Sequence, residues 1–294
     1  MILWTIRLLQ EWSVPWLQQR GIDTPRLDSD LLLADALGVE RLGLFLDPHR
    51  PVVGEELAVF KRHLQRRARR EPVAHILGHR AFWQHDFLVT SDVLVPRPET
   101  ELLIETVLDA LPPDQQQTPL TILELGVGSG AVLCTLLLAY GDAVGVGVDL
   151  SVAALAVAEE NGRRLGCLAR LSLLQGDLTQ PLHTSLHAEG RFQVVVANLP
   201  YIATADLARL EPEVAVWEPR LALDGGADGL AVVRRVPDAV WPWMAEGGLL
   251  ALEVGATQGD AVAELLRVAG WQGVALRLDY GRRPRVVLGY RGGA

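Results

Sequence analysis

The feature that most constrains the fold is the alternation of two hydrophobic patterns along the second half of the chain. Near-continuous apolar runs, each the length of one strand, lie at 121–126, 144–150, 171–178, 192–201 and 248–255. Segments with the period of a helix lie at 131–140, 151–166 and 259–270. Because parallel strands covered by helices on both faces have this pattern, we predict an α/β domain with a mostly parallel sheet.

The two ends of the chain have other patterns. Apolar residues at helical spacing indicate helices over residues 1 to about 80. The boundaries of these helices are expected at four prolines, Pro15, Pro25, Pro48 and Pro51. Short β-prone pieces between residues 82 and 95 predict a hairpin, which ends at the stiff stretch 96–98. The segment 273–290 reads as two strands, so we expect an antiparallel hairpin that closes one edge of the sheet.

One run in the helical part, 61–70, is strongly basic. We interpret it as the solvated face of a helix whose Leu64 and Ala68 point inward. A docking surface for an anionic partner is the alternative. The run has no spacing typical of a catalytic site, so this part of the chain is expected to serve recognition or support.

Composition excludes several classes of protein. With 294 residues, 49% of them apolar, the chain has enough material for a core and is expected to form one large domain or two unequal ones. No apolar run is long enough to span a bilayer, and the N-terminus does not resemble a secretory leader. Two cysteines and scattered histidines offer no metal-ligand spacing, so we expect no metal site. A reducing, cytoplasmic location is the simplest interpretation.

The charge of the chain is unevenly distributed. Residues 1–95 are neutral, so the whole formal charge of −9 falls on residues 96–294. A protein that follows a phosphate backbone usually has a positive surface. Stable nucleic-acid binding is therefore disfavoured.

Polar or glycine-rich residues follow each of the first four predicted strands. In doubly wound sheets ligands bind at the carboxyl ends of the strands. The first strand is followed by the loop Gly126-Val127-Gly128-Ser129-Gly130, which suits a dinucleotide as well as S-adenosylmethionine. The second strand ends at Asp149, at the spacing of a carboxylate that holds ribose hydroxyls. This pair of features predicts a nucleoside-containing cofactor.

Two details favour adenosylmethionine over NAD. Gly130 lets the backbone lie against a bulky ligand, and Glu124 offers a carboxylate to a cationic amino-acid sulfonium. Glu124 has a second interpretation, as a cap on a neighbouring turn. Asp177, after the third strand, would receive the adenine amino group or simply begin the turn at Gly176.

The tetrapeptide Asn198-Leu199-Pro200-Tyr201 follows the fourth strand and is the most informative motif. A planar amide or base nitrogen is a poor nucleophile because its lone pair is delocalised. The side-chain carbonyl of Asn198 and the main-chain carbonyl of Leu199 can each accept one N–H and so orient that lone pair. Pro200 stiffens the turn, and Tyr201 offers a flat face to a planar group. This arrangement predicts methyl transfer to a planar nitrogen.

The combined motifs resemble the HemK/PrmC glutamine methyltransferases, which modify the Gly-Gly-Gln glutamine of peptide-chain release factors. The resemblance covers much of the chain: 72–78 with Phe82-Trp83, 95–101, the glycine loop, Asp149, 198–201, Glu218-Pro219 with Ala222-Leu223, and 279–281 with Arg285-Val286. Its most specific part is Pro-Arg-Pro-Glu-Thr-Glu at 96–101. The resemblance implies a class I methyltransferase domain over 98–294, a β-hairpin linker over 81–97 and a helical substrate-recognition domain over 1–80.

The resemblance also implies roles for individual residues. The cofactor S-adenosylmethionine would be held by Glu124, Gly126, Val127, Gly128, Ser129, Gly130, Asp149, Asp177, Leu178 and Asn198. The release-factor glutamine would be bound and oriented by Asn198, Leu199, Pro200 and Tyr201, with Arg97 and Glu101 contributing. The protein partners would be class 1 release factors.

One departure from the family pattern keeps an alternative open. The family usually has Asn-Pro-Pro-Tyr, whereas Leu199 stands here at the first proline. Asn-Leu-Pro-Tyr is typical of ribosomal RNA adenine dimethyltransferases, so an adenine methyltransferase acting on RNA or DNA is the runner-up. An NAD-dependent oxidoreductase and a catalytically silent binding module are further alternatives.

Overall fold

The computed structural model describes residues 3–115, 118–184 and 191–293. These residues divide into two compact units. The first comprises Met1–His79 and Glu211–Trp217, and the second comprises Arg80–Leu210 and Glu218–Ala294. The short segment 211–217 thus belongs to the helical unit although it follows the fourth strand predicted from the sequence.

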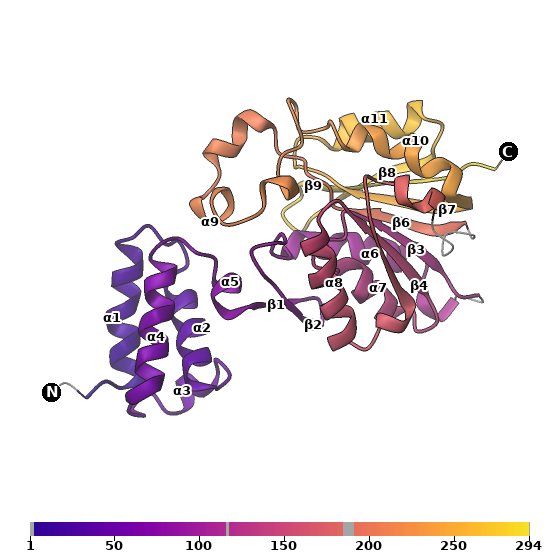
Figure 1. Cartoon of the computed structure of the whole chain (residues 1–294). Coiled ribbons are helices and arrows are strands. Elements are labelled where there is room, and N and C mark those ends of the chain that lie inside the picture. The colour runs from indigo at the N-terminus through magenta and orange to yellow at the C-terminus, as the bar shows by residue number, and fades with distance from the viewer. Residues whose placement is uncertain (1–2, 116–117, 185–190, 294) are drawn as a thin grey trace. The chain divides into compact units, whose positions relative to one another are not determined.

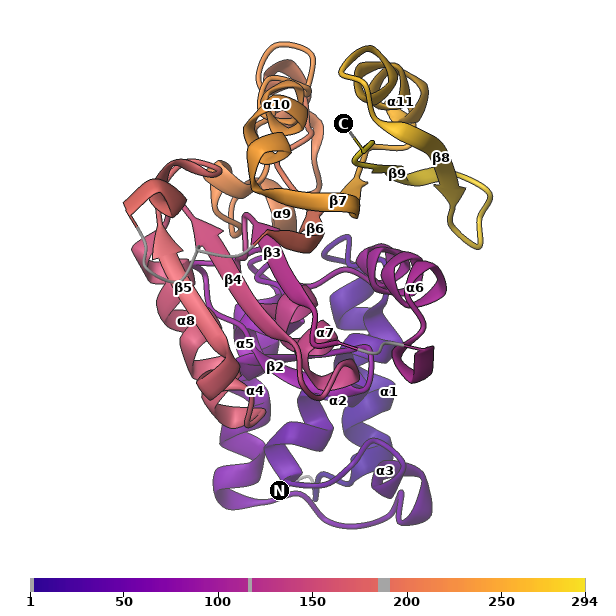
Figure 2. The same cartoon turned by 90° about the vertical axis from the view of Figure 1, so that its right-hand side faces the viewer.

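The first unit is helical. Its longer helices are α1 (Ile6–Gln18), α2 (Pro25–Leu37) and α4 (Gly54–Arg67), which Figures 1 and 2 show side by side. The short helices α3 (Gly43–Leu46), α5 (Val73–Leu77) and α9 (Pro212–Ala215) complete it. A buried cluster that includes Leu17, Leu32 and Phe60 forms its core. The prediction of a helical N-terminal part is confirmed.

The prediction that Pro15 lies between helices is wrong. Pro15 is inside α1, three residues before the helix ends at Gln18. An interior proline costs a helix roughly 3 kcal/mol, but α1 buries Ile6, Leu9 and Leu17 in the core, so packing outweighs the local preference. Pro25, at the start of α2, and Pro48 and Pro51, between α3 and α4, lie at helix boundaries as predicted.

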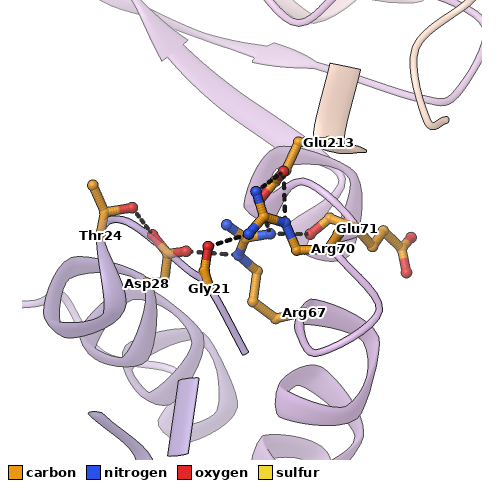
Figure 3. A network of polar contacts seen from close by, with 7 residues as sticks. All are labelled: Gly21, Thr24, Asp28, Arg67, Arg70, Glu71 and Glu213. Atoms are coloured by element: carbon orange, nitrogen blue, oxygen red, sulfur yellow. Dashed lines mark hydrogen bonds and ion pairs between the residues drawn. The ribbon is translucent and has the colours of Figure 1, made fainter. Parts of the chain in front are cut away.

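The basic run 61–70 is only partly a solvated face. Leu64 is buried as expected, but so is Arg67, whose side chain is 7% exposed. Arg67 Nε donates to Asp28 Oδ2 at 2.6 Å, and Arg66 pairs with Glu71. Figure 3 shows that this network extends to Arg70 and Glu213. For Arg67 and Arg70, with 7% and 20% of their side chains exposed, the solvated-face interpretation is wrong, because carboxylates of the same unit neutralise them. Arg66 remains 42% exposed.

A two-stranded hairpin is formed by β1 (His79–Phe82) and β2 (His85–Leu88), so the predicted hairpin is present but lies earlier in the chain than the expected range of 82 to 95. The seven-stranded sheet of the second unit has the order β5-β4-β3-β6-β7-β9-β8 (Figure 2). The strands are β3 (Thr121–Leu125), β4 (Val144–Asp149), β5 (Leu171–Gln175), β6 (Phe192–Ala197), β7 (Met244–Glu253), β8 (Gln272–Leu278) and β9 (Pro284–Tyr290). The first five are parallel, and β9 runs antiparallel to both β7 and β8. The predicted class I methyltransferase architecture with an antiparallel edge is confirmed.

Helices cover both faces of the sheet (Figure 1). One face packs against α6 (Glu101–Ala110), α7 (Ala131–Ala139) and α8 (Val152–Arg164), and the other against α10 (Val236–Val240) and α11 (Gly259–Val268). Successive residues of β3 enter opposite clusters, Ile122 on the first face and Leu123 on the second. This alternation is what buries both faces of a parallel strand.

Short 3₁₀ helices connect these elements: η1 (Pro98–Thr100), η2 (Pro113–Gln115), η3 (Leu168–Arg170), η4 (Gln180–Thr184), η6 (Thr204–Arg209), η7 (Arg220–Ala222), η8 (Val233–Arg235) and η9 (Trp241–Trp243). In the described ranges, none of the helices has the length and apolar character that crossing a membrane requires.

Candidate functional site

A cavity of about 220 Å³ lies in the second unit, at the carboxyl ends of β3, β4, β5 and β6. It brings together most of the residues singled out from the sequence. Those that line it are Arg97, Glu124, Gly126, Val127, Gly128, Ser129, Asp149, Asp177, Leu178, Asn198, Leu199 and Pro200. Within the described parts of the chain, its lining includes neither Glu101, Gly130 nor Tyr201.

The glycine loop is shaped by backbone geometry. Gly126, Gly128 and Gly130 have φ values of 70°, 52° and 77°. Residues other than glycine rarely adopt this positive-φ region. A Cβ on Gly130 would lie 3.2 Å from that of Ala158 on α8, so Gly130 permits close packing of α7 and α8. A Cβ on Gly126 would lie 3.0 Å from Leu199 Cδ2. The loop and the Asn198 motif are therefore in contact.

Glu124 is 2% exposed, and its Oε2 accepts a hydrogen bond from the backbone N of Leu133 at 2.9 Å. Leu133 lies in the first turn of α7, where backbone N–H groups have no partner within the helix. Burial raises the pKa of Glu124 well above its ordinary value, and the nearby Asp149 raises it further. The contact agrees with the interpretation of Glu124 as a cap, and the residue also lines the cavity.

Asp149 holds the loop in place. Its Oδ2 accepts from Gly128 N and its Oδ1 from Ser151 N, both at 2.9 Å. Each carboxylate oxygen has a further lone pair, so Asp149 can accept ribose hydroxyls without releasing the loop. A cavity that joins this carboxylate to a glycine-rich turn fits S-adenosylmethionine.

Asp177 has a partner that sequence reasoning missed. Its Oδ2 accepts a hydrogen bond from Arg235 Nη2 at 2.6 Å, and about half of the Arg235 side chain is exposed to solvent. The next residue, Leu178, has a φ of 50°, so the chain turns sharply there. Arg235 lies in η8, far along the chain, and no local pattern could have identified it.

The Asn198 motif is fixed by contacts from three directions. Asn198 Nδ2 donates to Thr100 Oγ1 at 3.1 Å, and Leu199 is 6% exposed against the glycine loop. The Tyr201 hydroxyl lies 3.5 Å from Glu253 Oε1, and burial raises the pKa of Tyr201 to about 12. Tyr201 thus supports the turn on the side away from the cavity, through its contact with Glu253.

Arg97 and Glu101 come from the Pro-Arg-Pro-Glu-Thr-Glu segment but have different surroundings. Arg97 Nη2 donates to Glu218 Oε1 at 2.5 Å. Burial raises the pKa of Glu218, and Arg97 opposes that effect. Glu101 Oε1 instead accepts from Trp83 N at 2.8 Å, which joins α6 to the hairpin. The structure therefore places Arg97 at the cavity and Glu101 in a structural contact.

Two further residues near the site, Thr100 and Glu253, were missed. Glu253 is the last residue of β7 and is 1% exposed. The rule that located Asn198, a polar residue at the carboxyl end of a parallel strand, would also have identified Glu253. Thr100 lies in the specific segment 96–101, but the strand-end rule does not apply to it. Among all the residues that the structure describes, no cluster of three or more His, Cys, Asp or Glu could hold a metal ion.

Comparison with known proteins gives two family matches. Residues 9–78 match the PrmC N-terminal domain, and residues 122–216 match a methyltransferase domain. The chain is 43% identical over 289 residues to the release factor glutamine methyltransferase of Caulobacter vibrioides, covering 98% of this chain and 97% of that protein. It is 39% identical to the enzyme of the same name from Geobacter sulfurreducens, covering 92% and 90%.

A solved structure shares the fold. The methyltransferase from Pyrococcus furiosus superposes with a TM-score of 0.53 over 78% of this chain and 99% of that one, at 16% sequence identity.

Proposed function

Because the chain belongs to the release factor glutamine methyltransferase family, we propose that it transfers a methyl group from S-adenosylmethionine to a release-factor glutamine. The acceptor is the side-chain amide nitrogen of the glutamine in the Gly-Gly-Gln motif of class 1 peptide-chain release factors. One observation carries the proposal for this chain itself: Asn198 and Leu199 line the same cavity as the glycine loop and Asp149. The acceptor and the methyl donor can therefore meet there.

The cavity divides between the two ligands. The loop 126–130 is proposed to surround the amino-acid end of adenosylmethionine, Asp149 to accept its ribose hydroxyls, and Asp177 with Leu178 to contact the adenine. When bound, this cofactor supplies an electrophilic methyl group on a sulfonium. Glu124, whose Oε2 already caps α7, would act mainly by holding the loop and helix together.

The chain's own contribution to the chemistry is orientation. The Asn198 Oδ1 and the Leu199 carbonyl each accept one N–H of the glutamine amide, which fixes the nitrogen with its lone pair toward the methyl group. Pro200 and Arg97 form part of the wall of the slot, and Tyr201 supports the turn through its contact with Glu253. Alignment of this kind can contribute about 7–11 kcal/mol to lowering a barrier.

The partner surface is proposed to include the helical N-terminal part, residues 1–80, because a small planar amide offers little area for specificity. Stable binding to nucleic acid is not expected, since residues 96–294 have the whole formal charge of −9. A cytoplasmic location, where release factors act, stays a prediction.

Adenine methylation is the second candidate, favoured by one residue, Leu199, in the Asn-Leu-Pro-Tyr motif. Leu199 packs on Gly126 and still offers its main-chain carbonyl, so glutamine transfer does not require proline there.

The test is incubation with labelled adenosylmethionine and three acceptors: a purified class 1 release factor, the same factor with its Gly-Gly-Gln glutamine changed to alanine, and ribosomal RNA. We expect label in the first acceptor alone. Label in the RNA, or equal label in both factors, would contradict the proposal.

A further inference from the structure

The main-chain carbonyls of the Asn198 motif (198–201) have two kinds of partner. In the proposed function the Leu199 carbonyl accepts an N–H of the substrate. The Tyr201 carbonyl instead accepts a hydrogen bond within the protein, from Gln258 Nε2 at 2.9 Å. At the other end of the same half-buried side chain, Gln258 Oε1 accepts from Gly255 N at 3.0 Å. Both ends of this amide have main-chain partners, so Gln258 has a fixed position beside the turn.

A second glycine-rich loop, 225–229, packs against the same turn. A Cβ on Gly225 would lie 2.7 Å from Pro200 O, and one on Gly229 would collide with Tyr201 O. Cβ atoms do not approach main-chain oxygens so closely, and both glycines are buried, so a side chain at either position would displace the turn. The loop and the turn are therefore in direct main-chain contact.

Main-chain hydrogen bonds extend this contact beyond the motif. Ile202 N donates to Leu223 O at 3.1 Å, and Gly225 N donates to Ile202 O at 2.8 Å. Both main-chain polar groups of Ile202 are thus paired with the segment 223–225. The direction in which the chain leaves the motif is therefore set by this segment.

The direction of the Leu199 carbonyl depends on this support. That carbonyl belongs to the planar peptide group that joins Leu199 to Pro200, and the Pro200 ring fixes φ. A shift of Pro200 or Tyr201 therefore moves the Leu199 carbonyl as well. Because reacting groups must be closely aligned, a displacement of about 1 Å can cost about a hundredfold in rate.

From these contacts we propose that Gln258 and the loop 225–229 are positioning residues, which keep the Leu199 carbonyl in the direction that accepts the glutamine N–H. The inference rests on the proposed function, because it assigns these residues to the transfer to glutamine. Among the described residues, the lining of the cavity includes neither Gln258 nor any member of 225–229. They act through the turn and do not touch the reacting atoms.

The first experiment removes the hydrogen bonds of Gln258 in the full-length enzyme and measures transfer to a class 1 release factor at saturating cofactor. Gln258→Leu should lower kcat about tenfold or more, with KM changed less than about threefold, because alignment matters most in the transition state.

Gln193→Leu is the matched control for this variant. Gln193 is also half-buried, and its Oε1 accepts hydrogen bonds from the N and the Oγ1 of Thr121. It lies near the start of β6, away from the cavity at the carboxyl ends of the strands. Its variant should keep kcat within about threefold of wild type.

Gln258→Glu isolates the contact with Tyr201. An ionised carboxylate can still accept from Gly255 N but has no hydrogen to donate to the Tyr201 carbonyl. We expect kcat to be as low as in Gln258→Leu. Because glutamate has nearly the same size as glutamine, this variant tests the positioning role even if Gln258→Leu does not fold.

The second experiment displaces the turn from the side of the loop. Gly229 and Gly247 have φ values of 77° and 73°, so alanine is strained to a similar degree at either position. Only the Cβ at 229 meets the turn, because none of the described atoms lies within 4 Å of one at 247. Gly229→Ala should lower kcat about tenfold or more, and Gly247→Ala should stay within about threefold of wild type.

Thermal unfolding and calorimetric binding of adenosylmethionine, measured on every variant, separate loss of alignment from loss of folding or of cofactor. Wild-type kcat in a folded Gln258→Leu or Gln258→Glu enzyme would overturn the positioning role while the proposed function stands. Losses of kcat in Gln193→Leu and Gly247→Ala as large as those in the variants they control would overturn it too. A wild-type enzyme that never labels the release factor would overturn the proposed function and this inference with it.

Discussion

Arg67 Nη1 lies 2.8 Å from Glu213 Oε1, and both side chains are largely buried, with 7% and 14% of their surface exposed. Arg67 comes from the end of α4, and Glu213 comes from α9, which follows the Asn198 motif in the chain. Arg70 also binds Glu213, with its Nη2 at 2.6 Å (Figure 3). One carboxylate therefore attaches the segment 211–217 to the helical unit through two arginines.

Removing that carboxylate should release the segment. Glu213→Gln leaves two guanidinium groups without their shared anion, although Arg67 keeps Asp28. Breaking a buried ion pair costs about 3–5 kcal/mol, and the remaining partner reduces this to a loss on the order of 2 kcal/mol in the free energy of unfolding. Chemical denaturation measures the loss, and hydrogen exchange at Val214 and Ala215 measures local opening.

Glu211→Gln serves as the control for this change. Glu211 lies in the same segment and is exposed, so its substitution should alter stability by less than about 0.5 kcal/mol. If both variants exchange and unfold alike, the network does not hold the segment.

Cofactor binding should depend on Asp149 in two ways. Asp149→Ala removes acceptors for the ribose and for Gly128 N, so adenosylmethionine binding should weaken by about 1.5–3 kcal/mol or more. Asp149→Asn retains one carbonyl oxygen that can still accept from Gly128 N, so its loss should be smaller. Calorimetry with adenosylmethionine, and with NAD as the control ligand, tests whether Asp149→Ala weakens cofactor binding more than Asp149→Asn does. Binding of NAD in place of adenosylmethionine would contradict the cofactor assignment.

The sequence predicted those features whose cause is local or periodic. Alternating apolar runs determine a parallel sheet, and polar residues at strand ends meet because parallel strands end at the same edge; Asp149 and Asn198 were found this way. Long-range side-chain pairs were not predicted, because no spacing encodes them: Thr100 with Asn198 and Asp177 with Arg235 are examples. Such pairs depend on loop paths that only the folded chain defines.

Errors arose where tertiary packing outweighed a local rule. Pro15 was expected to end a helix, yet the burial of Leu9 and Leu17 on the same face keeps α1 continuous around it. Arg67 was expected in water, yet carboxylates on either side make its burial tolerable. In both cases the missing information was the identity of the neighbouring element.

The buried Glu253 should make stability depend on pH. Its pKa is raised to about 7 when folded, from an ordinary value of 4.5, so the folded state binds the proton more tightly. Stability from this group is therefore greatest at low pH and decreases as the pH rises from about 4.5 to about 7. Glu253→Gln lacks this decrease, so its stability relative to wild type should be higher at about pH 8 than at about pH 5, by up to about 3 kcal/mol. Denaturation of both proteins at the two pH values tests this, and a difference independent of pH would contradict it.

The departure at position 199 provides the last prediction. If the working group there is the main-chain carbonyl, Leu199→Pro should leave kcat within about tenfold, equivalent to about 1.4 kcal/mol of barrier. The variant should nevertheless lose stability, by about 1–3 kcal/mol, because the buried Leu199 side chain packs against Gly126. Asn198→Ala removes an acceptor that orients the nucleophile, so kcat should fall by about 10²-fold or more.

Turnover and thermal unfolding measured together on both variants separate these effects. If Asn198 and Leu199 had only a structural role, the two substitutions would lower kcat only to the extent that they unfold the enzyme. A folded Asn198→Ala enzyme with near-normal turnover would therefore exclude the orientation mechanism. Conversely, a well-folded Leu199→Pro enzyme whose kcat falls as far as that of Asn198→Ala would show that the side chain at 199, and not its carbonyl, determines how the acceptor amide is held.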